Sequence, residues 1–285
     1  FHQREVRGII EEILDGGPVL GRETELDGRT ILLTGRPLPN GGAVLVLHDV
    51  TDLKRLDSVR RDFVANVSHE LKTPLTSISG YAETLLSDTP DEATRKRFLE
   101  VIAVNATRMQ HLVDDLLDLA RLESGQWQVQ PQPTDIAMAG REAFAAFTER
   151  AAQRGVRFDL DVPPGAAAWV DPEAFRQVLD NLFDNAVRHT PQGGRILLTA
   201  RPAEDAVEVA VQDTGSGIPH QHLHRVFERF YRADPGRSRQ EGGTGLGLAI
   251  VKHLVEAHGG TVSIESAVGE GTTVRMHFPN SPPEV

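Results

Sequence analysis

A histidine followed directly by a glutamate, His69-Glu70, lies in a stretch with helical periodicity and could act on phosphorus. A neutral imidazole is a good nucleophile at neutral pH, because an unperturbed histidine is then mostly unprotonated. A neighbouring carboxylate can accept the other ring proton and stabilise the imidazolium that forms. On a helical wheel His69 lies opposite the apolar arc, so we expect it to face solvent, with Thr73 on the same face. A solvent-facing histidine is more often ordinary surface, so these residues alone do not decide the function.

Two asparagines one helical turn apart, Asn181 and Asn185, follow Pro172 in another helical stretch. They lie on a different face from the apolar residues of that stretch. Paired amide oxygens can hold Mg²⁺, which prefers oxygen ligands and keeps waters and phosphate oxygens, so few protein contacts are needed. Buried asparagines also serve simply to satisfy backbone groups, and for this pair in isolation that interpretation is the stronger one.

Two glycine-rich segments could bring the backbone close to a nucleotide. In the first, Asp213 to Gly217, the carboxylate can accept a hydrogen bond from an adenine amino group, which guanine lacks at that position, although such turns are common strand exits. The second, Gly243 to Gly247, precedes a helix predicted over Ala249 to Ala257 and offers amide donors to phosphate oxygens. No strand directly precedes it and no Gly-Lys-Ser/Thr occurs, which argues against a dinucleotide fingerprint and a Walker-type loop.

A long helix must position His69. Apolar residues in heptad spacing predict this helix from about Thr51 to Ser87, bent at Pro74. We expect the next helix to begin with Thr89 as its N-cap, Pro90 at its first position and Glu92 completing a capping box. Two such helices form a hairpin, and a homodimeric four-helix bundle would cover both seams, although a plain dimerisation stalk fits equally well. The second seam comprises Phe98, Ile102, Asn105, Met109, Leu112, Leu116 and Leu119.

The flanking segments have mixed character. Residues 1 to about 48 predict one short helix and a hairpin whose strands, Thr30 to Arg36 and Ala43 to His48, are joined by a Pro-Asn-Gly-Gly turn. After Ser124-Gly125, strands and helices alternate, which predicts an α+β sandwich with helices on one face of a mixed sheet.

Composition excludes several classes of function. The net charge of -11 argues against a dominant electrostatic contact with nucleic acid or anionic lipid. The absence of cysteine excludes disulfides, cysteine-based zinc sites and thiol nucleophiles, and it fits a reducing cytoplasm. No apolar run approaches the roughly 20 residues of a membrane helix. The chain begins at a phenylalanine without a signal peptide, so we expect it to be part of a longer protein.

Taken together, these motifs resemble one family. The segment Val67 to Leu75, Val-Ser-His-Glu-Leu-Lys-Thr-Pro-Leu, closely resembles the phospho-acceptor box of sensor histidine kinases of bacterial two-component systems. The resemblance implies that His69 is phosphorylated, that Glu70 is its general base and that Thr73 positions water when the kinase acts in reverse as a phosphatase. It covers about residues 51 to 280. The first 48 residues look like the closing strands of a PAS sensor domain.

Four further segments are similar to the N, G1, F and G2 boxes of that family; in this order they are Asn181–Asn185, Asp213–Gly217, Phe227–Arg232 and Gly243–Gly247. This similarity implies a Bergerat fold with ATP and Mg²⁺ as ligands. By resemblance, Asn185 coordinates Mg²⁺ with help from Asn181, and Arg232 contacts phosphate from a mobile lid that runs to the last glycine. Arg188 and His189, where family members often have Lys-Tyr, are expected to reach phosphate or ribose oxygens, and Asp213 and Gly217 to define the adenine pocket. The expected nucleotide-binding residues are Asn181, Asn185, Arg188, His189, Asp213, Gly215, Gly217, Ile218, Arg232, Gly243, Thr244, Gly245, Leu246 and Gly247.

The expected activity is autophosphorylation on His69 and transfer to an aspartate of a response regulator receiver domain, with phosphatase activity on the same partner. We expect a homodimer, no nucleic-acid partner and no direct membrane contact in this cytoplasmic portion, the whole protein being anchored in the inner membrane by other segments. A Bergerat-fold ATPase or clamp without phosphohistidine and an inactive dimeric scaffold remain alternatives. The predicted fold is multidomain α+β: a partial PAS sheet over 1–50, a coiled-coil linker and dimerisation/phosphotransfer hairpin over 51–125, and an ATP-binding α/β sandwich over 126–285.

Overall fold

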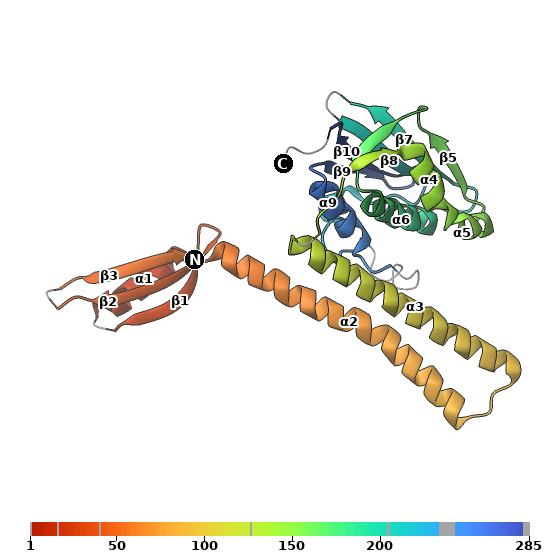
Figure 1. Ribbon diagram of the computed structural model, residues 1–285. Coiled ribbons are helices and arrows are strands. Elements are labelled where there is room, and N and C mark those ends of the chain that lie inside the picture. The colour runs from red at the N-terminus through yellow and green to blue at the C-terminus, as the bar shows by residue number, and fades with distance from the viewer. Residues whose placement is uncertain are drawn as a thin grey trace. The chain divides into compact units, whose positions relative to one another are not determined.

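The computed structural model describes residues 2–15, 17–39, 41–125, 127–203, 206–233 and 243–281, with side chains from residue 7 onward (Figure 1). The chain forms two compact units, Phe1–His69 and Glu70–Val285. The border between them falls inside a helix, whereas the sequence predicts domain borders near residues 50 and 125. The two units do not test where the three predicted domains begin and end, so the three-domain division stays a prediction.

The first unit contains a helix against a three-stranded antiparallel sheet of order β1-β2-β3. Its core consists of Ile9, Ile13, Val19 and Leu33, and the lack of a side chain at Gly35 gives Ile13 its space. The predicted hairpin is confirmed, with Asn40 of its turn outside the described residues. The first strand was not predicted, because charged residues obscure its alternation. The elements are α1 (His2–Leu14), β1 (Val19–Leu26), β2 (Arg29–Pro37) and β3 (Ala43–Asp49).

Two long helices follow, α2 (Thr51–Ser87) and α3 (Glu92–Glu123). The predicted end of α2 at Ser87 is confirmed, and the helix continues through the buried Pro74. The predicted N-cap of α3 is wrong: Asp91, not Thr89, caps the helix, because its carboxylate accepts hydrogen bonds from the backbone N and the hydroxyl of Thr94, both at 2.9 Å.

From Glu70 onward α2 lies alongside α3. The Tyr81 and Phe98 rings contact each other across the hairpin, with centroids 5.0 Å apart. Every predicted seam residue of α3 is buried or half-buried, and Leu112 and Leu119 are almost completely covered. The second seam is therefore confirmed.

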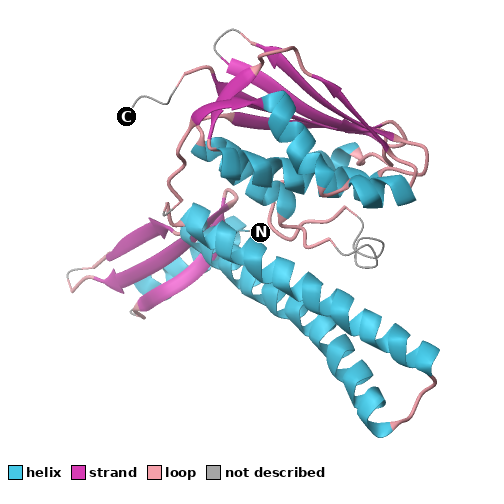
Figure 2. Cartoon of the chain, turned by 45° about the vertical axis from the view of Figure 1, so that its right-hand side comes forward, coloured by secondary structure: helices cyan, strands magenta, loops and turns pink. Residues whose placement is uncertain are grey.

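The remainder is a sandwich of two layers, with helices on one face of a five-stranded mixed sheet of order β5-β7-β8-β10-β9 (Figure 2). Only β5 and β7 pair in parallel. The expected α+β sandwich is confirmed. The sheet strands are β5 (Arg157–Asp161), β7 (Arg195–Pro202), β8 (Ala206–Asp213), β9 (Thr261–Ala267) and β10 (Gly271–Pro279); β4 (Gln132–Asp135) and β6 (Ala167–Val170) form a separate ribbon; the helices are α4 (Ile136–Ala145), α5 (Thr148–Gln153), α6 (Pro172–His189), α7 (His220–Leu223) and α9 (Gly247–Ala257).

Helix α6 carries most of the expected site residues, and its position is fixed at both ends. At the N-terminus the Asp171 carboxylate accepts hydrogen bonds from the backbone N of Glu173 and Ala174. At the C-terminus the Arg154 guanidinium donates to the carbonyls of Val187 and Arg188, at 3.0 and 2.6 Å. The apolar face of α6 is buried against the sheet, so the other face, which carries Asn181 and Asn185, is held in a fixed orientation.

None of the helices among the described residues has an apolar stretch long enough for a membrane span.

Candidate nucleotide site and phospho-acceptor helix

His69 is exposed on α2, as its position opposite the apolar arc predicts, and Thr73 is exposed one turn further along. Glu70 is different, since only 16% of its side chain is exposed. Its Oε2 accepts hydrogen bonds from Arg108 of α3 at 3.3 Å and from Arg232 at 3.1 Å. The carboxylate beside the candidate nucleophile is thus held by two arginines, of which sequence reasoning identified only Arg232, and for another role.

Residues of the expected N and G2 boxes lie close together: Asn181 is near Gly247, and Arg188 is near Gly243. The Asn181 amide donates to the Gln177 carbonyl at 2.9 Å, which leaves its Oδ1 as an acceptor. A Cβ added at Gly247 would lie 2.6 Å from that oxygen, and one at Gly243 would lie 2.8 Å from Nη1 of Arg188. Helix α6 and the glycine-rich loop therefore approach closely, and a side chain at either glycine would require the end of the Asn181 or Arg188 side chain to shift.

Asp213 ends β8 in a largely buried position, and burial raises the pKa of its carboxyl to about 6. Its Oδ1 accepts a hydrogen bond from the Gly215 backbone N at 2.7 Å. Gly217 has φ +68°, and a Cβ there would lie 1.9 Å from the Ala267 carbonyl oxygen, so no other residue fits without backbone movement. The next residue, Ile218, is anchored by its backbone N to Ser266 Oγ at 2.8 Å.

The glycine-rich loop is held on both sides. The Phe230 backbone N donates to the Gly245 carbonyl at 2.8 Å, and Leu246 is fully buried. The Thr244 hydroxyl donates to the Asp115 carboxylate of α3 at 3.0 Å. Arg232, expected to contact phosphate, donates to the Gly243 carbonyl as well as to Glu70. Residues 234–242, which make up most of the expected lid, lie outside the described residues. This range includes Gly242, which directly precedes the Gly243–Gly247 loop.

Two further expected residues lie at the C-terminal end of α6. His189 is exposed, and its backbone carbonyl accepts from the Ser216 N at 3.3 Å, so it joins α6 to the Asp213 turn through the main chain. The Arg188 side chain is only 14% exposed and pairs with Asp184. Asn185 lies between them and Asn181, half-buried.

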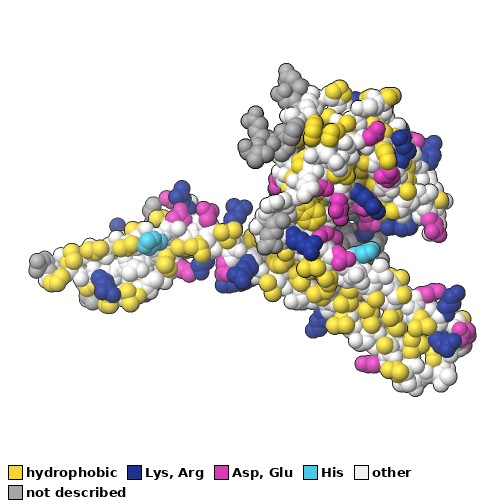
Figure 3. Space-filling view, in the orientation of Figure 1, with side chains coloured by type: hydrophobic (Ala, Val, Ile, Leu, Met, Phe, Trp, Pro, Cys, Tyr) yellow, Lys and Arg dark blue, Asp and Glu magenta, His cyan; other side chains and the backbone are white. Residues whose placement is uncertain are grey.

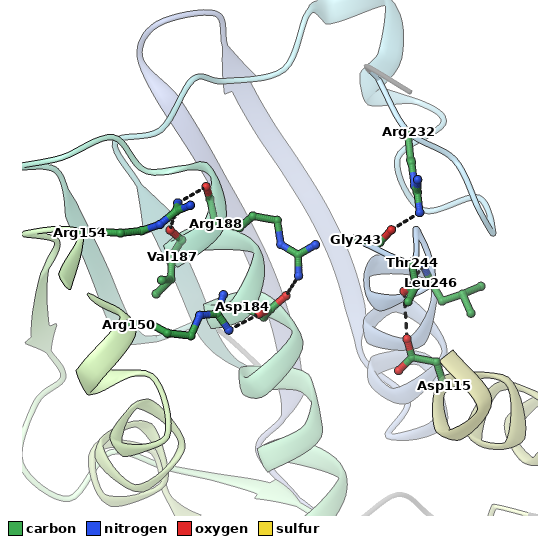
Figure 4. A network of polar contacts seen from close by, with 10 residues as sticks. All are labelled: Asp115, Arg150, Arg154, Asp184, Val187, Arg188, Arg232, Gly243, Thr244 and Leu246. Carbon is green, nitrogen blue, oxygen red and sulfur yellow. Dashed lines mark hydrogen bonds and ion pairs between the residues drawn. The ribbon is translucent and has the colours of Figure 1, made fainter. Parts of the chain in front are cut away.

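Sequence reasoning missed the acidic and basic residues that hold these groups (Figure 4). Asp115 contacts Thr244, and burial raises the pKa of its carboxyl to about 6. Asp184 accepts from Arg188 and, at 2.8 Å, from Arg150. In the sequence Asp115 lies on the polar side of a heptad pattern, where charges are ordinary, so no signal identified it. Asp184 lies inside the N box, between its two asparagines, and this position is a signal that could have identified it.

The residues fit a magnesium nucleotide. Nε and Nη1 of Arg188 are buried and have no hydrogen-bond partner among the residues that the structure describes, so an anionic oxygen would satisfy them. The glycine positions allow close backbone approach, and Asn181 and Asn185 supply amide oxygens of the kind Mg²⁺ takes. Within the described ranges, no group of three or more His, Asp or Glu forms a metal site, so any metal would depend on amides and phosphates.

Two family models match the chain. Residues 59–125 match the His Kinase A (phospho-acceptor) domain, and residues 170–282 match the histidine kinase-, DNA gyrase B- and HSP90-like ATPase domain. These ranges contain His69 with its helical hairpin and the whole candidate nucleotide site.

Named relatives agree with these matches. The phosphate regulon sensor protein PhoR of Pseudomonas aeruginosa is 41% identical over 241 residues, covering 82% of this chain and 53% of PhoR. The sensor-like histidine kinase SenX3 of Mycobacterium tuberculosis is 38% identical over 237 residues, covering 83% of this chain and 58% of SenX3. The chain thus spans about half the length of these curated relatives. The crystal structure of full-length ShkA with AMPPNP matches with 30% identity and a TM-score of 0.59, covering 79% of this chain and 47% of ShkA.

A phospho-acceptor domain followed by an ATPase domain of this type, in a chain similar over most of its length to sensor kinases, leaves one assignment: the chain belongs to the sensor histidine kinases of two-component systems.

Proposed function

We propose that this chain is an ATP-dependent protein-histidine kinase that phosphorylates itself on His69 and passes the phosphoryl group to an aspartate of a response regulator receiver domain. The observation that carries this proposal is the pairing of an exposed histidine inside an acceptor-type helix with a site whose buried arginine nitrogens and glycine loop suit a triphosphate. The AMPPNP complex of ShkA adds support for ATP as the nucleotide.

In the nucleotide site, the Asp213 carboxylate accepts the adenine amino group, and Gly215 and Gly217 let the backbone approach the ring. Arg188 and the amides of the Gly243–Gly247 loop bind phosphate oxygens, and the His189 region borders the ribose. Asn185 and Asn181 hold Mg²⁺, which when bound neutralises charge on the phosphates. Phosphoryl transfer depends mainly on such positioning and charge neutralisation.

At the acceptor, a His69 ring nitrogen attacks the terminal phosphorus of ATP, the bond from that phosphorus to the β–γ bridging oxygen breaks, and ADP leaves. Glu70 accepts the proton from the other ring nitrogen. Glu70 is paired with Arg108 and Arg232 in this structure, so this role requires a rearrangement that frees its carboxylate. The heptad seam at the start of α2 comprises Leu53, Leu56, Arg60, Phe63 and Val67. Movement of the ATP-binding part against the helices, driven by strain in this seam, would supply the rearrangement. Thr73 positions water in the reverse, phosphatase reaction.

A homodimer is part of this proposal. Besides its buried seam, the hairpin exposes large apolar side chains, visible along both helices in Figure 3. A four-helix bundle would cover them. They include Leu75, Leu86, Leu99, Val113 and Leu117, whose exposed fractions range from 42% to 88%.

The first unit is proposed to be the C-terminal part of a PAS sensor domain, supported by its antiparallel sheet with one packed helix. The cytoplasmic location of this portion and a membrane anchor elsewhere in the whole protein remain predictions, with fractionation of cells that express the full-length protein as their measurement.

The test of the kinase proposal is incubation of the chain and its His69→Gln variant with Mg²⁺ and γ-labelled ATP. We expect acid-labile, alkali-stable label on the wild type alone, with unchanged ATP binding by the variant. The control variant His111→Gln removes another exposed histidine, on α3, and should label normally. Equal or absent label on wild type and variant, with nucleotide still bound, would replace the kinase by an ATPase clamp or a scaffold.

A further inference from the structure

Asp184 lies on α6 between the two asparagines, and the proposed function gives it no part. Its carboxylate lies between two guanidinium groups: Oδ2 accepts from Nη2 of Arg188 one turn further along, and Oδ1 accepts from Nη1 of Arg150 on α5 at 2.8 Å (Figure 4). About 31% of the Asp184 side chain is exposed, against 51% for Arg150 and 14% for Arg188. The three residues therefore form a chain from the surface to the glycine-rich loop.

At the inner end of this row of three side chains, only some of the hydrogen-bond donors of Arg188 have partners. Nη2 of Arg188 pairs with Asp184, while Nε and Nη1 are buried without a partner among the described residues. Nη1 is the atom nearest to the Cβ position of Gly243, so it lies against the loop expected to hold phosphate. A buried guanidinium with unused donors is unfavourable unless an acceptor satisfies it, and a phosphate oxygen is such an acceptor.

The orientation of Arg188 depends on Asp184 rather than on the helix end. Arg154 donates to the α6 carbonyls of Val187 and Arg188, so the backbone at this helix end is fixed by a residue other than Asp184. An arginine side chain loses substantial rotamer entropy when it is ordered, and a charge-assisted contact can offset that loss in advance. Arg150 anchors the carboxylate, and the net charge of the three side chains remains +1, which suits an anionic ligand.

We propose that Asp184, anchored by Arg150, is a positioning residue that holds the Arg188 guanidinium against the phosphates of the bound nucleotide. The inference rests on the proposed ATP site and adds to it the groups that orient its arginine. It requires nucleotide binding only, so it can fail or hold regardless of whether His69 is phosphorylated.

The sign of one substitution separates this role from simple electrostatics. In Asp184→Asn a negative charge near the phosphates is removed, which would strengthen ATP binding if charge alone acted. If Asp184 positions Arg188, ATP binding weakens instead, by about three- to tenfold, roughly the net contribution of one ordinary hydrogen bond. Arg150→Ala should weaken ATP binding in the same direction and less.

Calorimetric or NMR titrations with ATP and with adenosine test this proposal. We expect Asp184→Asn to lower ATP affinity while adenosine affinity is unchanged, because adenosine has no phosphate for Arg188 to bind. Glu173→Gln, an exposed charge removal on the same helix, is the matched control and should change neither affinity. In an Arg188→Ala background the Asp184→Asn effect should vanish.

Three results would overturn the proposal: tighter or unchanged ATP binding by Asp184→Asn, an equal loss of adenosine binding that marks general damage to the site, or a full effect in the absence of Arg188. If the chain bound neither ligand, the ATP site itself would be wrong, which is a different failure.

Discussion

Burial of one acidic residue, Asp213 at the end of β8, changes the pH at which its carboxyl ionises. Asp213 is mostly removed from water and accepts backbone hydrogen bonds from Gly215 and Thr272, yet desolvation dominates and raises the pKa of its carboxyl to about 6. The carboxylate that would accept the adenine amino group is therefore the majority form only above that pH. As the pH falls through about 6, the proton occupies an acceptor oxygen and the site loses its preferred hydrogen bond.

We expect adenosine affinity of the wild type to fall as the pH is lowered from 7.5 to 5, because Asp213 becomes protonated. Adenosine avoids the titration of phosphate groups. In Asp213→Asn the affinity should be lower at pH 7.5 and the pH dependence flatter. Titrations at several pH values measure this, with Asp159→Asn, an exposed carboxyl on β5, as control. An equally steep pH dependence in Asp213→Asn would show that another group titrates.

Residue types and spacing led to the set of expected nucleotide-binding residues, because their motifs lie on one helix and two loops whose order is fixed by the chain, and the role of this set stays a prediction. They could not predict the partners that hold those residues. Glu70 and Arg108 are 38 positions apart, and Asp184 and Arg150 are 34 apart. Surface arginines and carboxylates are frequent, so only the packed structure selects which of them pair.

At the scale of elements, glycine shows how closely helices approach their neighbours. Gly140 lies inside α4, and a Cβ there would be 2.2 Å from Leu198 Cδ2 of the sheet. Gly80 lies inside α2, and a Cβ there would have no neighbour within 4 Å. Neither glycine has the positive φ that would itself disfavour alanine. The same substitution should therefore have opposite effects at the two positions.

We expect Gly140→Ala to destabilise the ATP-binding part by about 1–3 kcal/mol, because overpacking forces Leu198 or the helix to shift. Gly80→Ala should stabilise its helix by about 0.5–1 kcal/mol, since alanine has the higher helix propensity. Urea unfolding of both variants beside the wild type measures the two changes. A loss of stability for Gly80→Ala would mean that its face of α2 is covered, and no loss for Gly140→Ala would mean that α4 packs less closely than described.

Element positions were largely predictable where one periodicity persists. The four-three seam of α3 and the end of α2 at Ser87 follow from side-chain repeats that packing then uses. The cap of α3 was misassigned because Thr89, Pro90 and Asp91 all favour a helix start, and the choice among them depends on backbone geometry. The first strand, with its Gly-Arg-Glu-Thr-Glu run, carries too many charges for an alternation to show.

At the scale of the whole molecule, the unit from Glu70 to Val285 joins helices and sandwich through polar contacts, and four of those among the described residues involve acidic residues of the hairpin. Three of these residues belong to the last turns of α3. This acidic side of the hairpin agrees with the negative net charge of the chain, and it engages Thr244, a residue expected to bind nucleotide. The contacts are Glu70–Arg232, Asp115–Thr244, Asp118–Gln177 and Glu123–Arg229.

Ionisation of Asp115 makes its contact with Thr244 dependent on pH. Burial is the main cause that raises the pKa of its carboxyl from 3.8 to about 6, with further upward contributions from Asp118 and Asp114, while Thr244 and His111 act in the opposite direction. The folded state therefore binds the proton more tightly than the unfolded chain. Its contribution to stability is fully present below pH 3.8 and is lost as the pH rises through about 6.

Replacing Asp115 by asparagine removes this ionisation and leaves an amide oxygen that still accepts from Thr244. The free energy of unfolding of Asp115→Asn, relative to the wild type, should therefore increase between pH 4.5 and 7.5 by about 2 kcal/mol. This is less than the ~3 kcal/mol of the full shift, because pH 4.5 already lies above the unfolded pKa of 3.8. Urea unfolding of Asp115→Asn and of the wild type at the two pH values measures this difference. If the difference between Asp115→Asn and wild type were the same at both pH values, the carboxyl would be hydrated in solution, and the contact between α3 and the glycine-rich loop would be open.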